Sequence, residues 1–218
     1  MQSIPTLMRR FLPLAAIFLA ALALPAAAQP VAVEEGKQYL RMATPQPVET
    51  GKKIEVIEFF SYGCPHCGEL EPILQGWVKT LPADVQFRRI PVIFQDRWLP
   101  LAKIYYTLDA LGEEARLSPE VFTALHGKGL PLWQDKAFLD WAAGQGLDRK
   151  KVEDMYNSFA IAGKVNRAKA AAQAYKINEV PKFVVDGKYV TNNVASHRAM
   201  PGVLDALIVK ARAERPKS

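Results

Sequence analysis

The sequence predicts an α/β fold that is interrupted by an all-helical segment. β-branched and aromatic residues at 54–60 lead directly into apolar residues at spacings of 3, 4, 7, 8 and 11 from Leu70, which indicates a strand followed by an amphipathic helix. Residues 84–92 and 182–190 carry further strand signals. Between them, residues 96–164 show helical spacing and no strand signal. Without that segment, the chain predicts a small sheet flanked by helices.

The N-terminal residues have the parts of a secretory signal peptide. Two arginines at positions 9 and 10 are followed by an apolar run from Phe11 to Leu24 and by small residues that end at Ala28. We expect cleavage near Ala28, so that residues 1–28 are removed from a soluble, exported chain. The alternative is an uncleaved N-terminal anchor, for which the apolar run is short.

The charge of the chain argues against a nucleic-acid partner. Removal of the signal peptide takes away two arginines and lowers the formal net charge from +6 to +4. This small excess is scattered along the chain, whereas a nucleic-acid footprint needs a concentrated basic patch. We expect the Arg88-Arg89 pair to be a solvated strand edge.

The first part of the predicted α/β domain covers residues 29–95. Residues 31–48 contain two prolines and predict an extended lead-in with a short edge strand. The helix that follows the central strand contains Pro72, which should bend it without ending it, because the apolar spacing continues to Leu81. The second strand should end at Pro91.

Residues 96–164 predict an inserted domain of three or four short helices. Glycine and proline breaks divide the segment, and Ser118 and Asp148 are the expected N-caps of two of its helices. Its tryptophans, Trp98, Trp133 and Trp141, are expected to belong to a core and not to a peptide-binding stripe.

Residues 165–218 complete the α/β domain. An alanine-rich helical stretch is followed by Val180-Pro181 and by a hairpin whose Asp186-Gly187 pair suits a tight turn. Pro201 should lie near the start of a last helix. The apolar residues of that helix form one buried stripe: Leu204, Leu207, Ile208 and Ala211.

The chain has two cysteines, Cys64 and Cys67, and their spacing restricts what they can do. They are too close to join distant parts of a fold, so their use is local: redox-active, metal-binding or inert. Haem attachment would need a histidine where the chain has Gly68. A structural disulfide over so short a loop gains little chain entropy. We predict no metal, because only His66, His126 and His197 could complete a zinc site, and no second C-x-x-C exists.

The position of the cysteines favours thiol chemistry. Cys64 lies where the helix begins, with Pro65 suited to the first turn, so backbone N–H groups should point at its sulfur. His66 can place a positive charge nearby, although it could equally be an exposed loop residue. We therefore predict Cys64 as the attacking and attacked sulfur and the more buried Cys67 as the resolving thiol.

Glu58 is a third candidate, on the strand before the cysteines. It shares strand parity with Ile54, Val56 and Phe60, so its carboxylate should face an apolar layer and its pKa should rise. We hypothesise that it exchanges protons with Cys67 through water. The alternative is a carboxylate at the strand end that a lysine or solvent satisfies.

Residues 58–67, the Val180-Pro181 step and the following hairpin together resemble the DsbA family of periplasmic thiol:disulfide oxidoreductases, which have a thioredoxin fold with a helical insertion. The resemblance implies that Pro181 is cis and faces the active-site disulfide, and that the backbone of Val180 pairs with substrate. Lys182 would then lie near the site, or point to solvent. The resemblance further implies periplasmic clients, reoxidation by a quinone-linked membrane partner of the DsbB type, and no cofactor besides the Cys64-Cys67 disulfide.

The favoured function is an exported, monomeric dithiol oxidase that introduces disulfides into unfolded exported chains. One alternative is a disulfide isomerase or reductase on the same fold, although the lead-in is too short for a dimerisation domain. Another is a chaperone-like module that binds unfolded chains beside an incidental C-x-x-C. His126 and His197 are expected outside any constellation of functional residues.

Overall fold

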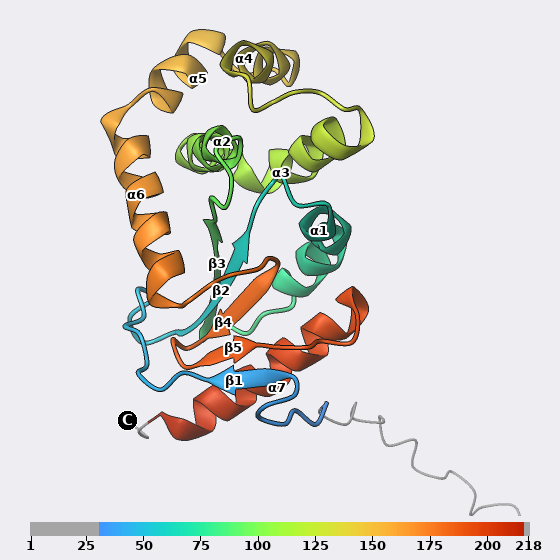
Figure 1. The fold of residues 1–218 in the computed structure, drawn as a ribbon, viewed down its shortest axis with the longest axis vertical. Helices are drawn as coiled ribbons and strands as arrows, with labels where there is room; N and C mark the ends of the chain where they lie inside the picture. Colours follow the sequence, from blue (N-terminus) through green and yellow to red (C-terminus); the bar gives the residue numbers. More distant parts are fainter. Residues whose placement is uncertain (1–30, 216–218) are drawn as a thin grey trace, which may run out of the picture.

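The computed structural model describes residues 31–215, so the predicted signal peptide lies outside the described residues. One five-stranded sheet has the order β1-β5-β4-β2-β3 (Figure 1). β2 and the edge strand β3 are parallel, and the other pairs are antiparallel. The strands are β1 (Tyr39–Arg41), β2 (Ile54–Phe60), β3 (Val85–Pro91), β4 (Lys182–Val185) and β5 (Tyr189–Thr191).

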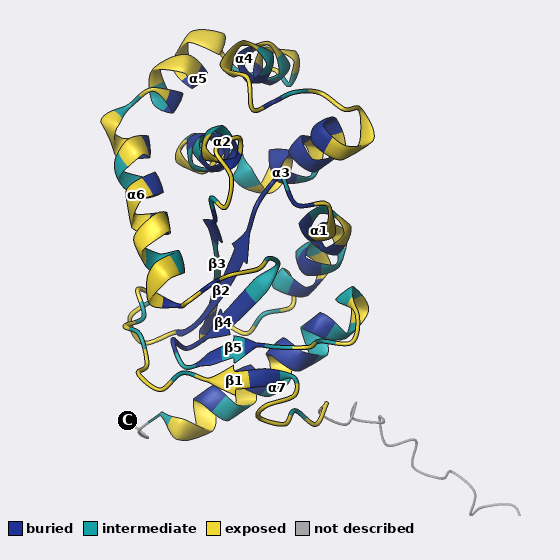
Figure 2. Cartoon of the chain, in the orientation of Figure 1, coloured by how far each residue is buried: buried dark blue, intermediate teal, exposed yellow. Residues whose placement is uncertain are grey.

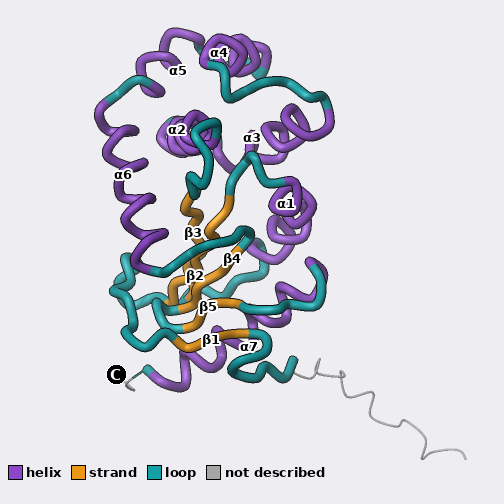
Figure 3. The backbone as a smooth tube through the Cα atoms, viewed as in Figure 1, coloured by secondary structure: helices purple, strands orange, loops and turns teal. Residues whose placement is uncertain are grey.

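Helices cover both faces of the sheet and form a separate group above it (Figure 3). Their bounds are α1 (Pro65–Val78), α2 (Trp98–Ala110), α3 (Glu114–Phe122), α4 (Asp135–Gly144), α5 (Arg149–Tyr156), α6 (Phe159–Ala174) and α7 (Met200–Glu214). A π-helical turn, η1 (Thr123–Gly127), extends α3, and a 3-10 turn, η2 (His197–Ala199), precedes α7. Within residues 31–215, none of these helices combines the length and the apolar character needed to cross a membrane.

The interior strand β2 separates two cores. All seven of its residues are buried, as the dark blue ribbon in Figure 2 shows. Ile54 and Val56 pack with α1 and α7 on one face, while Ile57 and Phe59 pack with the helical segment and the end of α6 on the other. Because β2 is buried on both faces, the residues that follow it are held in a fixed position above the sheet.

The predicted elements of the α/β part are confirmed. The lead-in contributes the edge strand β1, α1 continues through Pro72, and β3 ends at Pro91. In the hairpin, Asp186 and Gly187 both have positive φ, and the Lys188 N–H donates to the Val185 carbonyl. The predicted stripe of α7 is buried: Leu204, Leu207, Ile208 and Ala211.

The inserted segment contains the four helices α2 to α5. Helix α6 then runs from this segment down the side of the sheet (Figure 1) and spans the 164/165 boundary as one continuous helix. The predicted N-cap at Ser118 is wrong, because Ser118 lies inside α3. Its hydroxyl donates to Glu114 Oε1 in the preceding turn at 2.9 Å and lies 2.6 Å from the Tyr62 hydroxyl. The predicted N-cap at Asp148 is confirmed, because its Oδ1 accepts the Lys151 N–H at 3.0 Å.

Replacing Asp148 by alanine is expected to lower the free energy of unfolding by ~1 kcal/mol, because a backbone N–H at the start of α5 loses its acceptor. Asp154→Ala in the same helix removes only an exposed ion pair with Lys150 and should lower the free energy of unfolding by about 0.3 kcal/mol. Denaturant unfolding of both variants checks the difference. Equal losses would contradict the capping role.

Candidate active site

The two cysteines lie where β2 passes into α1. After β2 ends at Phe60, the chain turns through Ser61 to Gly63, and Cys64 occupies the N-cap position of α1 with extended backbone angles. Pro65 begins the helix, as predicted, and Cys67 lies in its first turn. Both cysteines are free thiols, 7% exposed at Cys64 and 1% exposed at Cys67. The predicted difference in accessibility is present.

Several groups lower the pKa of the Cys64 thiol to about 6. The largest contribution is a hydrogen bond from the Cys67 thiol. The backbone N–H groups of Cys67 and His66 add to it, as expected for a sulfur at a helix N-terminus, while burial acts in the opposite direction. At neutral pH, Cys64 is therefore largely a thiolate when the pair is reduced.

Cys67 has the opposite environment. Burial raises the pKa of its thiol far above the ordinary value, and the hydrogen bond to Cys64 and the charge of Glu58 raise it further. Cys67 therefore keeps its proton and donates it to the Cys64 sulfur. This asymmetry is the physical basis for our prediction that Cys64 attacks and Cys67 resolves.

His66 contributes less to the thiolate than the sequence suggests. Its side chain is exposed, and its Nδ1 lies 3.1 Å from Glu69 Oε2. The hydrogen bond to this carboxylate raises the pKa of the imidazole. The charge of the ring does lower the pKa of Cys64, but by less than the hydrogen bonds from Cys67 and from the backbone do.

His66→Ala is expected to raise the Cys64 pKa, but by less than Cys67→Ala, which removes the largest stabilising hydrogen bond. Ultraviolet titration of the thiolate in the two reduced variants measures both shifts against the parent. An unchanged titration in His66→Ala would exclude a tuning role for the ring. A larger shift in His66→Ala than in Cys67→Ala would contradict the order found here.

Glu58 is buried and its pKa rises to about 7, as predicted. Burial is the largest cause, and the nearby Arg89 opposes it. The partner of Glu58 is neither absent, as expected for a lone carboxylate, nor a lysine or solvent, but an arginine. Arg89 lies directly opposite Glu58 in the parallel β2–β3 register, and its Nε donates to Glu58 Oε2 at 2.8 Å.

The expectation of a solvated Arg88-Arg89 pair is therefore wrong. The Arg89 side chain is only 8% exposed and bonds Glu71 and Glu114 in addition to Glu58. Arg88 is 24% exposed and pairs with the buried Glu55 at 3.0 Å. β3 is indeed an edge strand, but α1 and α3 bring carboxylates to Arg89 and β2 brings one to Arg88, which the sequence pattern of β3 does not show.

Arg89 joins the active-site strand to the helical segment. Glu71 comes from α1, and Glu114 from α3 accepts from Arg89 Nη1 at 2.9 Å. Glu114 also accepts from Ser118, whose hydroxyl contacts the Tyr62 hydroxyl two residues before Cys64. One guanidinium thus holds three carboxylates beneath the cysteines.

The Val180-Pro181 peptide bond is cis, which agrees with the expectation from the resemblance. Val180 O lies 3.6 Å from Cys64 Sγ, so the chain after α6 returns to the cysteines. Lys182 forms an ion pair with Glu179, and its side chain is 12% exposed, so it does not point freely into solvent.

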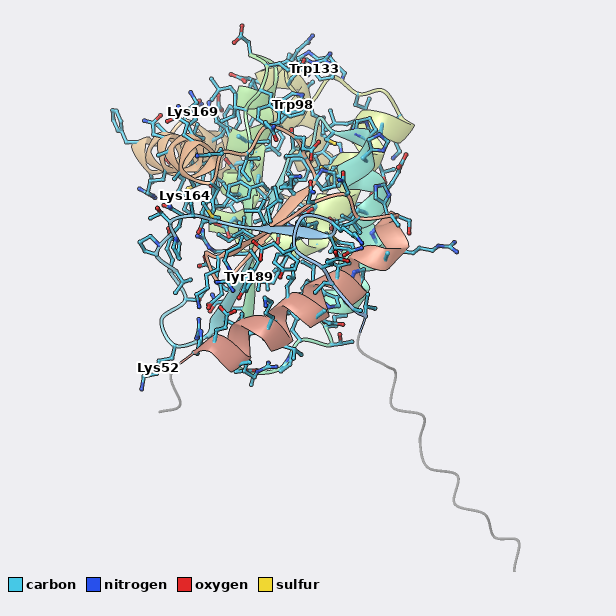
Figure 4. The ribbon with its side chains drawn as sticks, turned by 60° about the horizontal axis from the view of Figure 1, so that its bottom comes forward. Lys52, Trp98, Trp133, Lys164, Lys169 and Tyr189 are labelled. Carbon is cyan, nitrogen blue, oxygen red and sulfur yellow. The ribbon has the colours of Figure 1, made fainter. Side chains whose placement is uncertain are left out.

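A groove of about 590 Å³ lies beside Cys64 and is partly apolar. Its walls include Phe94, Trp98, Leu125 and Trp133, together with Val180 from the other part of the chain. The expected core position is confirmed for Trp98, which also borders the groove, but is wrong for the exposed Trp133; Figure 4 labels both on the helical segment. Trp98 is buried as well, and its indole N–H has no partner among the described residues. The groove therefore offers apolar surface beside Cys64.

His126 and His197 also lie closer to the cysteines than expected. His126 Nε2 contacts the Tyr62 carbonyl at 2.8 Å, and His126 borders the groove. The His197 ring lies 5.8 Å from the His66 ring. No local pattern in the sequence indicates either position, because both contacts join residues more than sixty positions apart.

The fold and the site define the class of this protein: a thioredoxin-fold thiol:disulfide oxidoreductase with a helical insertion and one dithiol at a helix N-terminus. A family model described as DSBA-like thioredoxin domain matches residues 55–199. The chain belongs to this DsbA-like family.

Curated relatives and a solved structure agree with this assignment. The thiol:disulfide interchange protein DsbA of Bordetella parapertussis is 42% identical over 179 residues, which cover 81% of this chain and 85% of the relative. DsbA of Pseudomonas aeruginosa PAO1 is 42% identical over 154 residues, covering 71% and 73% of the two chains. The crystal structure of Pseudomonas aeruginosa DsbA has a TM-score of 0.79 at 39% identity and covers 82% of this chain and 94% of the other.

Proposed function

We propose that this protein is an exported dithiol oxidase that introduces disulfides into unfolded chains. A client thiolate attacks Cys64 Sγ in the Cys64–Cys67 disulfide, and Cys67 leaves as a thiolate and takes up a proton. The second thiol of the client loses its proton and attacks the client sulfur of the mixed disulfide, and Cys64 leaves. The client gains a disulfide, and the protein gains two electrons.

The lowered pKa of Cys64 is the observation that carries the direction of this reaction. Each unit by which the thiolate pKa falls stabilises the reduced form by ~1.4 kcal/mol, or ~30 mV for a two-electron couple. The pKa of Cys64 falls from 9.0 to about 6. The upper limit of the effect is therefore about 90 mV, which solvent near this sulfur reduces. A stabilised thiolate makes Cys64 a good leaving group, so oxidation of the client is favoured.

Three other groups have proposed roles around the disulfide. Glu58, whose pKa is about 7, gives a proton to Cys67 when it leaves and recovers it when the disulfide forms again. The Val180 carbonyl, next to Cys64 Sγ, accepts a backbone N–H of the client. The groove lined by Trp98 and Trp133 receives an apolar client side chain.

The remaining features of the cycle rest on the family. The reduced pair returns its electrons to a quinone-linked membrane reoxidase of the DsbB type, so the protein needs no cofactor besides its disulfide. The chain works as a monomer in the periplasm after its signal peptide is removed near Ala28.

Replacing Cys64 by serine is expected to abolish oxidation of a reduced, unfolded client, because no sulfur remains for the client to attack. Cys67→Ser is the matched variant: its Cys64 thiolate should attack the disulfide of an oxidised peptide, one peptide sulfur leaves as a thiolate, and the mixed disulfide should accumulate because no Cys67 thiol remains to release Cys64. Disulfide formation in a reduced peptide tests Cys64→Ser, and mixed-disulfide capture with an oxidised peptide tests Cys67→Ser. Substantial oxidation by Cys64→Ser would exclude the mechanism. Efficient rescue of a scrambled client by the parent protein would instead favour an isomerase.

A further inference from the structure

Three side chains of metal-binding types gather at the rim of the active site, and none of them is a reacting group in the dithiol mechanism. His66 and Glu69 lie one turn apart at the start of α1, and His197 comes from η2, which packs against that helix. One potential ligand atom from each residue lies within 4.8 Å of the other two. We call these three residues the rim cluster.

The spacing of the rim cluster suits a small tetrahedral ion. Glu69 Oε2 lies 3.1 Å from His66 Nδ1 and 3.6 Å from His197 Nδ1. Zinc binds such atoms at about 2.0–2.2 Å, so two ligands on a tetrahedral ion lie about 3.3–3.5 Å apart. The two measured separations fall on either side of that value, so small side-chain adjustments would let all three atoms bind one ion.

The backbone beneath the cluster is held in place. His66 and Glu69 are fixed by the first turns of α1, and the Ser196 side chain caps η2 by accepting the Ala199 N–H. A second groove, different from the one beside Trp98, has His66, His197 and Lys182 in its wall. The positive charge of Lys182 is paired with Glu179. The three ligand side chains are 69%, 59% and 34% exposed, so an ion can reach them from solvent.

We propose that His66, Glu69 and His197 form a zinc site with two imidazole ligands, one carboxylate ligand and an open fourth position. Two histidines and one carboxylate form a zinc ligand set in which water or another ligand takes the fourth place. The site is independent of the proposed oxidase function, because it needs neither cysteine. Bound zinc would lie beside the Cys64-Cys67 pair at the side of Val180 and Pro181, which border the same groove.

Calorimetric titration of Zn²⁺ into the oxidised mature protein, which lacks only the signal peptide, tests the site. The oxidised form is required because free thiols bind zinc themselves, and a Cys64→Ser/Cys67→Ser double variant repeats the measurement without any thiol. We expect one equivalent of Zn²⁺ to bind both proteins. Mg²⁺, which prefers oxygen ligands, should not bind there.

Variants of the cluster separate this site from other surface binding. His197→Gln and Glu69→Gln should each raise the Zn²⁺ dissociation constant by about 10- to 100-fold or more, since even outer partners of metal ligands contribute that much. Glu120→Gln, an exposed carboxylate on α3, is the matched control and should leave it unchanged. Thermal unfolding without metal verifies that each variant is folded. Absence of binding to the parent, or unchanged binding to either cluster variant, would overturn the proposal.

Discussion

Replacing Arg89 by methionine is expected to lower the free energy of unfolding by about 3–5 kcal/mol, the usual cost of removing one partner from a buried ion pair. The Arg89 guanidinium is 8% exposed, and the Glu58 and Glu71 carboxylates are 2% and 4% exposed. Methionine fills similar space but leaves these carboxylates without their cation. They must then take up protons or remain charged in a buried place, and both outcomes destabilise the folded chain.

The loss in Arg89→Met should grow with pH. The pKa of Glu58 is about 7 in the folded protein, compared with 4.5 for a glutamate in the unfolded chain. The stability that this difference contributes is fully present below pH 4.5 and is lost as the pH rises through 7. Without Arg89, the attraction that opposes burial disappears, and the pKa values of Glu58 and Glu71 rise further. Denaturant unfolding of the oxidised protein on either side of this window, at about pH 5 and pH 8, measures the change without titration of the cysteines.

Two variants test whether charge burial causes this loss. Arg116→Met removes an exposed pair with Glu113 and should cost only about 0–1 kcal/mol. Adding Glu58→Gln to Arg89→Met removes one unpaired carboxylate and should recover part of the loss. A cost for Arg89→Met no larger than that for Arg116→Met, or one that does not change with pH, would contradict the account of this network.

Gly63→Ala is expected to cost about 1–3 kcal/mol by overpacking at the residue before Cys64. A Cβ placed at Gly63 would meet the Trp98 indole, lying 2.8 Å from Cδ1 and 3.0 Å from Cε2. The indole is buried and rigid, so either it or the turn that carries Cys64 must move. We therefore expect slower reaction of Cys64 with a reduced peptide in addition to the lower stability.

Gly76→Ala provides the matched control and should have the opposite sign. Gly76 lies in α1, where an added Cβ meets nothing within 4 Å. Alanine in a helix is favoured over glycine by roughly 0.5–1 kcal/mol, so this variant should be more stable than the parent. Unfolding and peptide-reaction rates of the two variants are compared with the parent. A neutral Gly63→Ala would show that the Trp98 contact is not tight.

Local sequence patterns predict much of this fold because the relevant forces act between near neighbours. The alternation and apolar content of residues 54–60 predict β2, and the spacing after Leu70 predicts α1. The Asp186-Gly187 pair predicts a tight turn because both residues tolerate positive φ. The same local argument places Cys64 at a helix N-terminus, which is the origin of part of its lowered pKa.

Local patterns were less reliable inside the helical segment. Ser118 before Pro119 has the composition of a helix start, yet α3 begins at Glu114 and continues through both residues. The Ala115 carbonyl, which lies one turn before Pro119, accepts a side-chain N–H from Gln75 on α1 at 3.5 Å. The local preference of Ser118 and Pro119 therefore does not decide where α3 begins.

The sequence by itself determined the order of the elements, the place of the dithiol at the start of α1 and the two cysteines as the reactive pair. Only the tertiary structure decided the surroundings of that pair. Arg89 is buried because α1 and α3 bring Glu71 and Glu114 to it, and His197 lies beside His66 because η2 packs on α1. Residue type and spacing carry information over a few turns of chain. Burial, charge pairing and grooves depend on which distant elements pack together, and that is settled only when the whole core forms.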